Sequence, residues 1–165
     1  MKRAKGSVSI SAELKAFLES GVSVVVGTRD ADLVPEITRA WGVLVSKDRT
    51  SISLCVPLAT SQKSLDNLAG NGQITVCCSL PTSYKTVQLK GQCIGTAGPR
   101  RADLTAVERH REAFGRLNDR IGFRRQRVET FWQRELETSP GLITLRFVPE
   151  PIFDQTPGPD AGSPL

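Results

Sequence analysis

The sequence has few aromatic residues, no long apolar run and a single histidine. Aromatic side chains account for 5% of its 165 residues, so it has few rings on which a single-stranded nucleic acid could stack. Its apolar stretches are far shorter than the roughly 20 residues that a membrane-spanning helix needs. The basic N-terminus MKRAKGSVSIS is not followed by an apolar segment, so we expect no secretory signal. We therefore expect a cytoplasmic protein without a membrane partner.

Metal-binding patterns are also missing. The four cysteines contain no CxxC pair, and no histidine stands at a spacing from them that suits zinc. Cys55, Cys77, Cys78 and Cys93 all lie inside apolar runs, which is typical of reduced core cysteines in the cytoplasm. The single histidine, His110, lies in an arginine-rich segment and is predicted to be a surface residue without a special role. We predict no metal site.

The chain is basic, with a net charge of +5. Between Arg100 and Glu137 there are ten arginines against seven acidic residues, in an interleaved order. Interleaved charges are typical of a solvated helix face with pairs of opposite charge one turn apart, not of a nucleic-acid-binding stripe. We therefore do not expect nucleic acid as a partner.

The apolar pattern predicts six strands, joined for the most part by short turns. These strands are expected over residues 22–28, 35–45, 51–56, 73–80, 86–97 and 140–155. Gly42 is expected to mark a bulge or a close approach of two backbones, and Pro149 and Pro151 are expected to make the end of the last strand an edge.

Helical spacing predicts three further regions. A first helix is expected over 11–21, with Ser11 as its N-cap and Gly21 at the C′ position. A short helix should begin at Ser61 and end at Gly70. Two more helices are expected between 103 and 136, separated by Gly122. The tail 156–165 is rich in glycine and proline, and is predicted to be extended.

This order of elements favours one mainly β domain over residues 1–165, with peripheral helices. Consecutive strands joined by short turns form antiparallel pairs. Six such strands, with few residues left to cover both faces of an open sheet, suggest a small six-stranded barrel.

The connection PLATSQKSLDNLAGNG, residues 57–72, carries a candidate anion site. The first turn of a helix leaves backbone N–H groups without helical partners, and the helix dipole adds partial positive charge there. Thr60, Ser61 and Lys63 would bring hydroxyls and a cation to the same end, as a phosphate group requires. The alternative is that Ser61 serves only as an N-cap and Lys63 is a solvated side chain.

Arg39 is a second candidate, because an arginine in the middle of a strand is unusual. Alternation places Arg39 on the same face as Ile37 and Trp41. An arginine among apolar neighbours either binds an anion or covers apolar surface with its stem at the rim of a sheet, and the residues alone leave both open.

Three segments resemble the pyridoxamine 5′-phosphate oxidase-like family, whose fold is the FMN-binding split β-barrel. They are PEITRAWGVLV, SISLCVPLATSQKSLDNLAGNGQITVCC and VQLKGQCIGTA, and the order of elements matches over about 20–150. In that family a strand arginine and a Ser-x-Lys at a helix start hold the FMN phosphate. The resemblance implies an FMN site on this chain and a homodimer with two sites at its interface. The implied cofactor-binding residues are Arg39, Trp41, Thr60, Ser61, Gln62, Lys63 and Thr86.

The sequence departs from the oxidase at several of these positions. Gln62 stands where the oxidase has an arginine, and Thr86 aligns with a family glutamine. The tail lacks the tryptophan and arginine of the oxidase, and no Arg-x-His pair is present. These departures argue against pyridoxamine phosphate as the substrate and identify a short, divergent member.

Two functions follow from the resemblance. The first is an FMN-dependent oxidoreductase, in which the flavin carries the redox chemistry. The second is a non-catalytic split-barrel protein that binds a flavin, a haem or another anionic ligand, and a deazaflavin or no cofactor are further alternatives. No Ser/His/Asp, Cys/His or paired-carboxylate arrangement is visible, so the catalytic residues, the substrate and the reaction are left unassigned.

Overall fold

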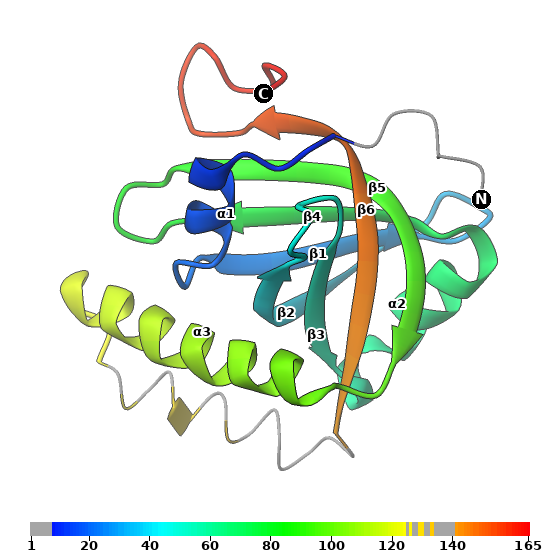
Figure 1. Ribbon diagram of the computed structural model, residues 1–165, viewed down its shortest axis with the longest axis horizontal. Coiled ribbons are helices and arrows are strands. Elements are labelled where there is room, and N and C mark those ends of the chain that lie inside the picture. The colour runs from blue at the N-terminus through cyan, green and yellow to red at the C-terminus, as the bar shows by residue number, and fades with distance from the viewer. Residues whose placement is uncertain (1–7, 125, 127–128, 131–132, 134–140) are drawn as a thin grey trace.

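In the computed structural model, six antiparallel strands form a closed barrel in the order β1-β2-β3-β6-β5-β4. The structure describes residues 8–124, 126, 129–130, 133 and 141–165. Its elements are α1 (Ala12–Leu18), β1 (Ser23–Arg29), β2 (Pro35–Val45), β3 (Ile52–Pro57), α2 (Leu58–Asn71), β4 (Gln73–Ser79), β5 (Thr86–Ala97), α3 (Arg101–Arg120) and β6 (Leu142–Asp154). The predicted fold class, a mainly β barrel with peripheral helices, is confirmed (Figure 1).

Alternating side chains divide the strands into an inner and an outer face. Val24 and Val26 of β1 and Ile74 and Val76 of β4 are buried in one apolar cluster inside the barrel. The residues between them face outward and are half-buried or exposed. Strand β3 differs because all six of its residues are buried. Its inner face joins the barrel core, while Cys55 on the other face packs with Trp41 and Val107 of α3.

Helices α2 and α3 cover different parts of the barrel, as Figure 1 shows. Helix α3 packs along β2, and α2 contacts β1, β2, β3 and β4. The second of the two helices predicted between 103 and 136 falls largely outside the described residues. No helix in the described part of the chain is both long and apolar enough to cross a membrane.

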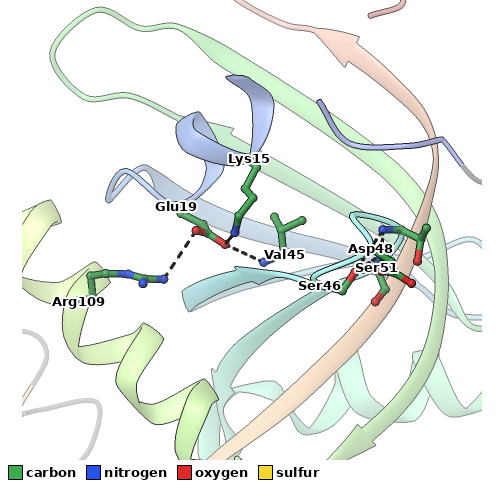
Figure 2. Close-up of polar contacts among 8 residues, drawn as sticks. Lys15, Glu19, Val45, Ser46, Asp48, Ser51 and Arg109 are labelled. Carbon is green, nitrogen blue, oxygen red and sulfur yellow. Dashed lines mark hydrogen bonds and ion pairs between the residues drawn. The ribbon is translucent and has the colours of Figure 1, made fainter. Parts of the chain in front are cut away.

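Glu19, directly after α1, ties three elements together (Figure 2). Its carboxylate accepts a hydrogen bond from the Val45 N–H of β2 at 3.0 Å and pairs with Lys15 of α1. Arg109 of α3 lies 3.9 Å from its second oxygen. Ser11 caps α1 as predicted, accepting from the N–H of Leu14. The C-cap of α1 is Glu19, so the predicted placement of Gly21 at the C′ position was wrong by one residue.

The last strand and the tail behave differently from each other. Beyond Phe147, β6 continues its pairing with β5 but no longer pairs with β3, as Pro149 and Pro151 indicated, and this edge is covered by the tail, where Pro164 pairs with Phe153. The tail is not simply extended. It turns back on β6, where Asp154 N–H donates to Ser163 O and Leu165 N–H donates to Ile152 O, both at 2.9 Å. Backbone hydrogen bonds therefore hold a segment that its composition had marked as loose.

Candidate functional site

Helix α2 begins one turn earlier than the sequence predicted. Strand β3 runs directly into it through Pro57, which is the N-cap residue, and the helix continues to Asn71. Ser61 is therefore inside the helix, and its prediction as the N-cap was wrong. Gly72, not Gly70, ends the helix in the left-handed conformation, at φ 68°. A proline fits the start of a helix because its fixed φ is compatible with the helical turn that follows.

The N-terminus of α2 has no side-chain cap and no acidic residue in its first turn. The first helical N–H, that of Leu58, donates to Gly141 O at 3.0 Å. Thr60 in the first turn and Lys63 in the second turn are exposed. Gln62 is also exposed, and its amide donates to Asp66 one turn further along. The helix dipole and the Lys63 ammonium together make this end favourable for an anion.

Three of the four buried residues of α2 are polar, and the fourth, Leu68, joins the barrel core. Ser61 is 1% exposed, and its hydroxyl lies 2.9 Å from the hydroxyl of Thr38 in β2. One and a half turns later, the Asn67 amide donates to the Thr28 hydroxyl of β1 at 3.1 Å. Between them, Ser64 is 1% exposed and its hydroxyl has no hydrogen-bond partner among the residues described. Of the hydroxyls at the predicted anion site, that of Ser61 therefore joins the helix to the barrel, while that of Thr60 is exposed.

Arg39 lies close to the start of α2. Trp41 pairs with Cys55 across β2 and β3, so Arg39, two residues back along β2, is level with the point where β3 ends at Pro57. The predicted alternation is confirmed, because Thr38 and Ala40 are buried while Arg39 is half-buried on the outer face. The register thus brings Arg39 and the α2 N-terminus to the same end of β2 and β3.

Trp41 and His110 lie together beneath α3. Trp41 is 1% exposed, with its ring centroid 5.6 Å from that of His110 and 5.9 Å from that of Phe114. Its side chain is enclosed and has no face left for a cofactor. The prediction of His110 as a surface residue was wrong, because it is 5% exposed. Spacing could have revealed this, since Val107, His110 and Phe114 stand three and four residues apart, on one helical face.

Both ring nitrogens of His110 are occupied. Nδ1 accepts from the Gly42 N–H at 2.7 Å, which leaves the proton on Nε2 for donation to Val22 O at 2.8 Å. Burial lowers the pKa of His110 to about 4, with the positive charge of Arg39 acting in the same direction. The hydrogen bond to Val22 O opposes these effects. The imidazole is therefore neutral at pH 7 and joins α3 to β2 and to Val22, the residue directly before β1.

Thr86 lies away from the other predicted cofactor residues. It begins β5, where its hydroxyl donates to Tyr84 O at 2.8 Å and its N–H donates to the Thr156 hydroxyl at 3.1 Å. Strands β1 and β4 separate β5 from β2 in the barrel. Three strand spacings of about 4.8 Å each put Thr86 roughly 14 Å from the β2 backbone along the sheet. Within one chain, Thr86 cannot contact a phosphate held at Arg39.

The cysteines are free, as predicted, with Cys55 and Cys78 buried and Cys77 and Cys93 half-buried. Burial raises the pKa of all four thiols, most of all that of Cys78. The thiolate, which is the nucleophilic form, is therefore disfavoured at each position. Within residues 8–124 and 141–165 and the four described residues between them, no group of three or more His, Cys, Asp or Glu side chains could hold a metal ion.

Comparison with known proteins relates the chain to others by structure and not by sequence. No family model and no curated protein matches it. HupZ of Group A Streptococcus is similar to it over 93% of this chain and 99% of its own, with 17% identity and a TM-score of 0.53. An FMN-binding protein from Syntrophomonas wolfei matches over 85% of this chain and 82% of its own, with 12% identity and a TM-score of 0.51.

A Clostridium acetobutylicum protein, related to general stress protein 26 and of the pyridoxinephosphate oxidase family, is also similar. The match covers 86% of this chain and 84% of the Clostridium acetobutylicum protein, with 18% identity and a TM-score of 0.53. At such identities the likeness establishes a common fold. Together with the closed six-stranded order, it shows that the chain has the split barrel of the pyridoxamine 5′-phosphate oxidase-like proteins.

Proposed function

We propose that this protein binds FMN at the N-terminus of α2 and acts as a flavin-dependent oxidoreductase. The observation that supports this most is the start of α2, which has no side-chain cap and no acid in its first turn, and is followed in the second turn by Lys63. The similarity to an FMN-binding protein from Syntrophomonas wolfei adds a fold in which such a ligand is bound. Fold alone does not identify a reaction, so the proposal is made from the chemistry of this end of the helix.

A phosphate group fits the donors present here. Thr60 in the first turn of α2 and Lys63 in the second are exposed, and Arg39 is level with the helix start on the outer face of β2. An arginine fork and an ammonium both form charge-assisted hydrogen bonds to phosphate oxygens. Ser61 acts as a positioning residue, because its hydroxyl bonds to Thr38 and holds α2 on the barrel. We do not include the Trp41 side chain, which is enclosed beneath α3.

The protein is also proposed to be a homodimer. Thr86, the remaining predicted cofactor residue, is too far from Arg39 for both to contact the phosphate group within a chain. The outer face between them carries small side chains, including Val25, Cys77 and Ser79, and is only partly exposed. A second copy packed on this face would bring its Thr86 toward Arg39. Light scattering should give about twice 17.9 kDa, and a monomer at micromolar concentration would contradict the dimer.

Bound FMN would supply the electron-accepting ring, and the chain would supply orientation and exclusion of water. No described side chain is assigned as a general acid or base. His110 is unsuited to that role, because both of its nitrogens are hydrogen-bonded beneath α3. The same contacts remove the chain's single histidine as an axial ligand for haem iron, so flavin is favoured over histidine-ligated haem. Flavin bands that NAD(P)H bleaches would support an oxidoreductase, whereas a Soret band would support a haem protein.

The decisive experiment compares FMN with riboflavin, which lacks the phosphate. Both are titrated into wild type, Lys63→Ala and Lys47→Ala, the last being a control with the same charge change in the exposed β2–β3 turn. Loss of one charge-assisted hydrogen bond, worth about 1.5–3 kcal/mol, should weaken FMN binding by roughly 10- to 150-fold in Lys63→Ala only. Riboflavin binding should be unchanged in all three.

Two results would refute this assignment. If Lys63→Ala loses equal affinity for FMN and riboflavin, or for neither, Lys63 does not hold the phosphate. If Lys47→Ala weakens FMN binding as much as Lys63→Ala, the effect is general charge attraction. A parallel titration with a deazaflavin distinguishes the two classes of cofactor, since the flavin proposal requires tighter binding of FMN.

A further inference from the structure

A cavity of about 430 Å³ lies on the outer side of the barrel, where β1, β4, β5 and β6 meet. Its lining comes from residues 27–29, 73–75, 90–92 and 150–151. None of the seven predicted cofactor residues belongs to it. Its volume lies within the range of small-molecule sites, which is about 300–1,000 Å³. This cavity is separate from the start of α2 and needs its own explanation.

The strand register explains why the surface is hollow here. Three adjacent strands, β1, β4 and β5, place Gly27, Thr75 and Lys90 side by side. Because Gly27 has no side chain and that of Thr75 is short, the sheet surface is recessed at these two positions. Between β5 and β6, Leu89 pairs with Ile152 and Gly91 pairs with Pro149. Two residues of β6 therefore lie opposite the single residue Lys90 of β5, which makes a bulge in β6. This bulge carries Glu150 and Pro151 into the cavity wall. Bulges of this kind redirect side chains and are common beside binding sites.

Two cations face the hollow, and one of them is held in place. The Arg29 guanidinium donates from Nε and Nη2 to the Gln73 side-chain oxygen, at 3.2 and 2.9 Å, and from Nη1 to Asp30 O at 2.9 Å. The Lys90 ammonium lies 5.3 Å from the centre of the Phe153 ring. In the described part of the chain, neither cation has a carboxylate within 4.0 Å. Arg29 is thus pre-oriented without being neutralised.

The lining chemistry selects a class of ligand. The guanidinium and the ammonium that line this cavity are both groups that form charge-assisted hydrogen bonds to phosphate oxygens. Glu150 adds a carboxylate in the same wall, which disfavours a bare anion but accepts hydrogen bonds from hydroxyl groups. The amide of Gln92 contributes further polar contacts. A ligand with a phosphate at one end could bind the two cations, and hydroxyl groups at its other end could donate hydrogen bonds to the carboxylate.

We propose that this cavity is a second ligand site, which binds a small hydroxylated organic phosphate through Arg29 and Lys90 on one side and Glu150 on the other. The site is independent of the flavin assignment, because it shares no residue with the start of α2. Ribose 5-phosphate is a suitable probe, with inorganic phosphate and ribose as its two halves.

The experiment measures binding of ribose 5-phosphate by calorimetry to the full chain. The cavity variant is Arg29→Gln/Lys90→Gln, and the control is Lys47→Gln/Arg116→Gln, which removes the same charge from exposed positions elsewhere. The cavity variant should bind at least roughly tenfold more weakly, as expected from the loss of charge-assisted hydrogen bonds. The control and Lys63→Ala should bind as wild type does. Glu150→Gln should weaken binding of ribose 5-phosphate but not of inorganic phosphate.

Several results would overturn the proposal. They are absence of binding to wild type, equal losses in the cavity and control variants, and loss in Lys63→Ala instead, which would place the phosphate at α2. Thermal melting of each variant checks folding, and Lys90→Gln alone replaces the double variant if that protein unfolds. FMN affinity should be unchanged by the cavity variant, so a failure of this proposal is distinguishable from a failure of the flavin proposal.

Discussion

Helices α2 and α3 both cover the barrel, but aromatic packing is confined to the contact of α3, while α2 adds mainly polar side chains to that of Leu68. Beneath α3, the rings of Trp41 and Phe114 and the side chain of Val107 fill the interface. The single buried imidazole there, His110, has both nitrogens hydrogen-bonded to backbone groups. This contact is stabilised by apolar burial, and its polar atoms are satisfied.

Beside Leu68, helix α2 turns three polar side chains to the barrel. Ser61 and Asn67 bond to Thr38 and Thr28, and Ser64 has no partner in the described chain. A polar contact of this kind contributes less to stability than apolar burial, because hydrogen bonds to water are given up when it forms. Helix α3 is therefore attached to the barrel mainly by apolar packing, whereas hydrogen bonds make up more of the attachment of α2.

The largest expected effect tests the close packing under α3. Gly42 has φ 68°, and a Cβ there would lie 2.7 Å from the backbone nitrogen of Val107. Gly42→Ala should therefore destabilise the fold by about 3 kcal/mol or more, from left-handed strain together with overpacking. Urea unfolding measures this. Gly70→Ala is the matched control in α2, where nothing lies within 4 Å, and it should stabilise by about 0.5–1 kcal/mol. A similar loss of stability in both variants would contradict the conclusion that close packing against α3 requires glycine at position 42.

The second prediction concerns acid. The pKa of His110 is about 4 in the folded protein, against about 6.5 in the unfolded chain. As the pH falls below 6.5 the unfolded chain takes up a proton first, so stability is lost between pH 6.5 and 4. The loss should approach about 3 kcal/mol. Asp103, whose pKa is lowered chiefly by its hydrogen bond with Arg100, contributes only at lower pH.

Urea unfolding at pH 7.0, 5.5 and 4.5 follows this loss. His110→Gln removes the titrating group, so it should be less stable than wild type at pH 7 and should lack the decline toward pH 4.5. An equal decline in wild type and His110→Gln would show that other groups cause the acid sensitivity.

The third prediction tests the polar face of α2 at Ser61. Ser61→Ala would leave the buried hydroxyl of Thr38 without this partner, which costs about 1–3 kcal/mol. The cause is a lost tertiary hydrogen bond and not a lost N-cap. Thr38→Val in the Ser61→Ala background should therefore recover part of the loss, since both hydroxyls are then removed. If the double variant is no more stable than Ser61→Ala, the two hydroxyls are not coupled.

The smallest effect is expected one turn further along. Ser64→Ala removes a buried hydroxyl that has no partner in the described structure, so it should stabilise the protein by about 1 kcal/mol. The same substitution thus has opposite signs at two positions on one face of α2. A loss of stability in Ser64→Ala would show that this hydroxyl is bonded in solution.

Much of the barrel could be predicted from the chain, because strands β2 and β5 have the predicted bounds, 35–45 and 86–97. Alternation of apolar residues is a local property, and proline and glycine mark the ends of strands. The start of α2 was predicted one turn late, because Ser61 has the chemistry of an N-cap and the helix is capped by Pro57 without any side-chain bond. The preference of serine for the N-cap position was overridden by tertiary structure, because β3 continues directly into the helix.

The alternation of apolar residues, the bounds of β2 and β5 and the place of four cysteines in apolar strands can all be read from the chain. The partner that each polar side chain meets depends on the folded barrel. The tertiary structure buries His110 under α3, directs Ser61 to Thr38, encloses Trp41, and folds the tail back on β6. The physical reason is that alternation and helical spacing depend on neighbours a few residues away. Burial and hydrogen bonding depend instead on residues that closure of the barrel brings together from distant parts of the chain.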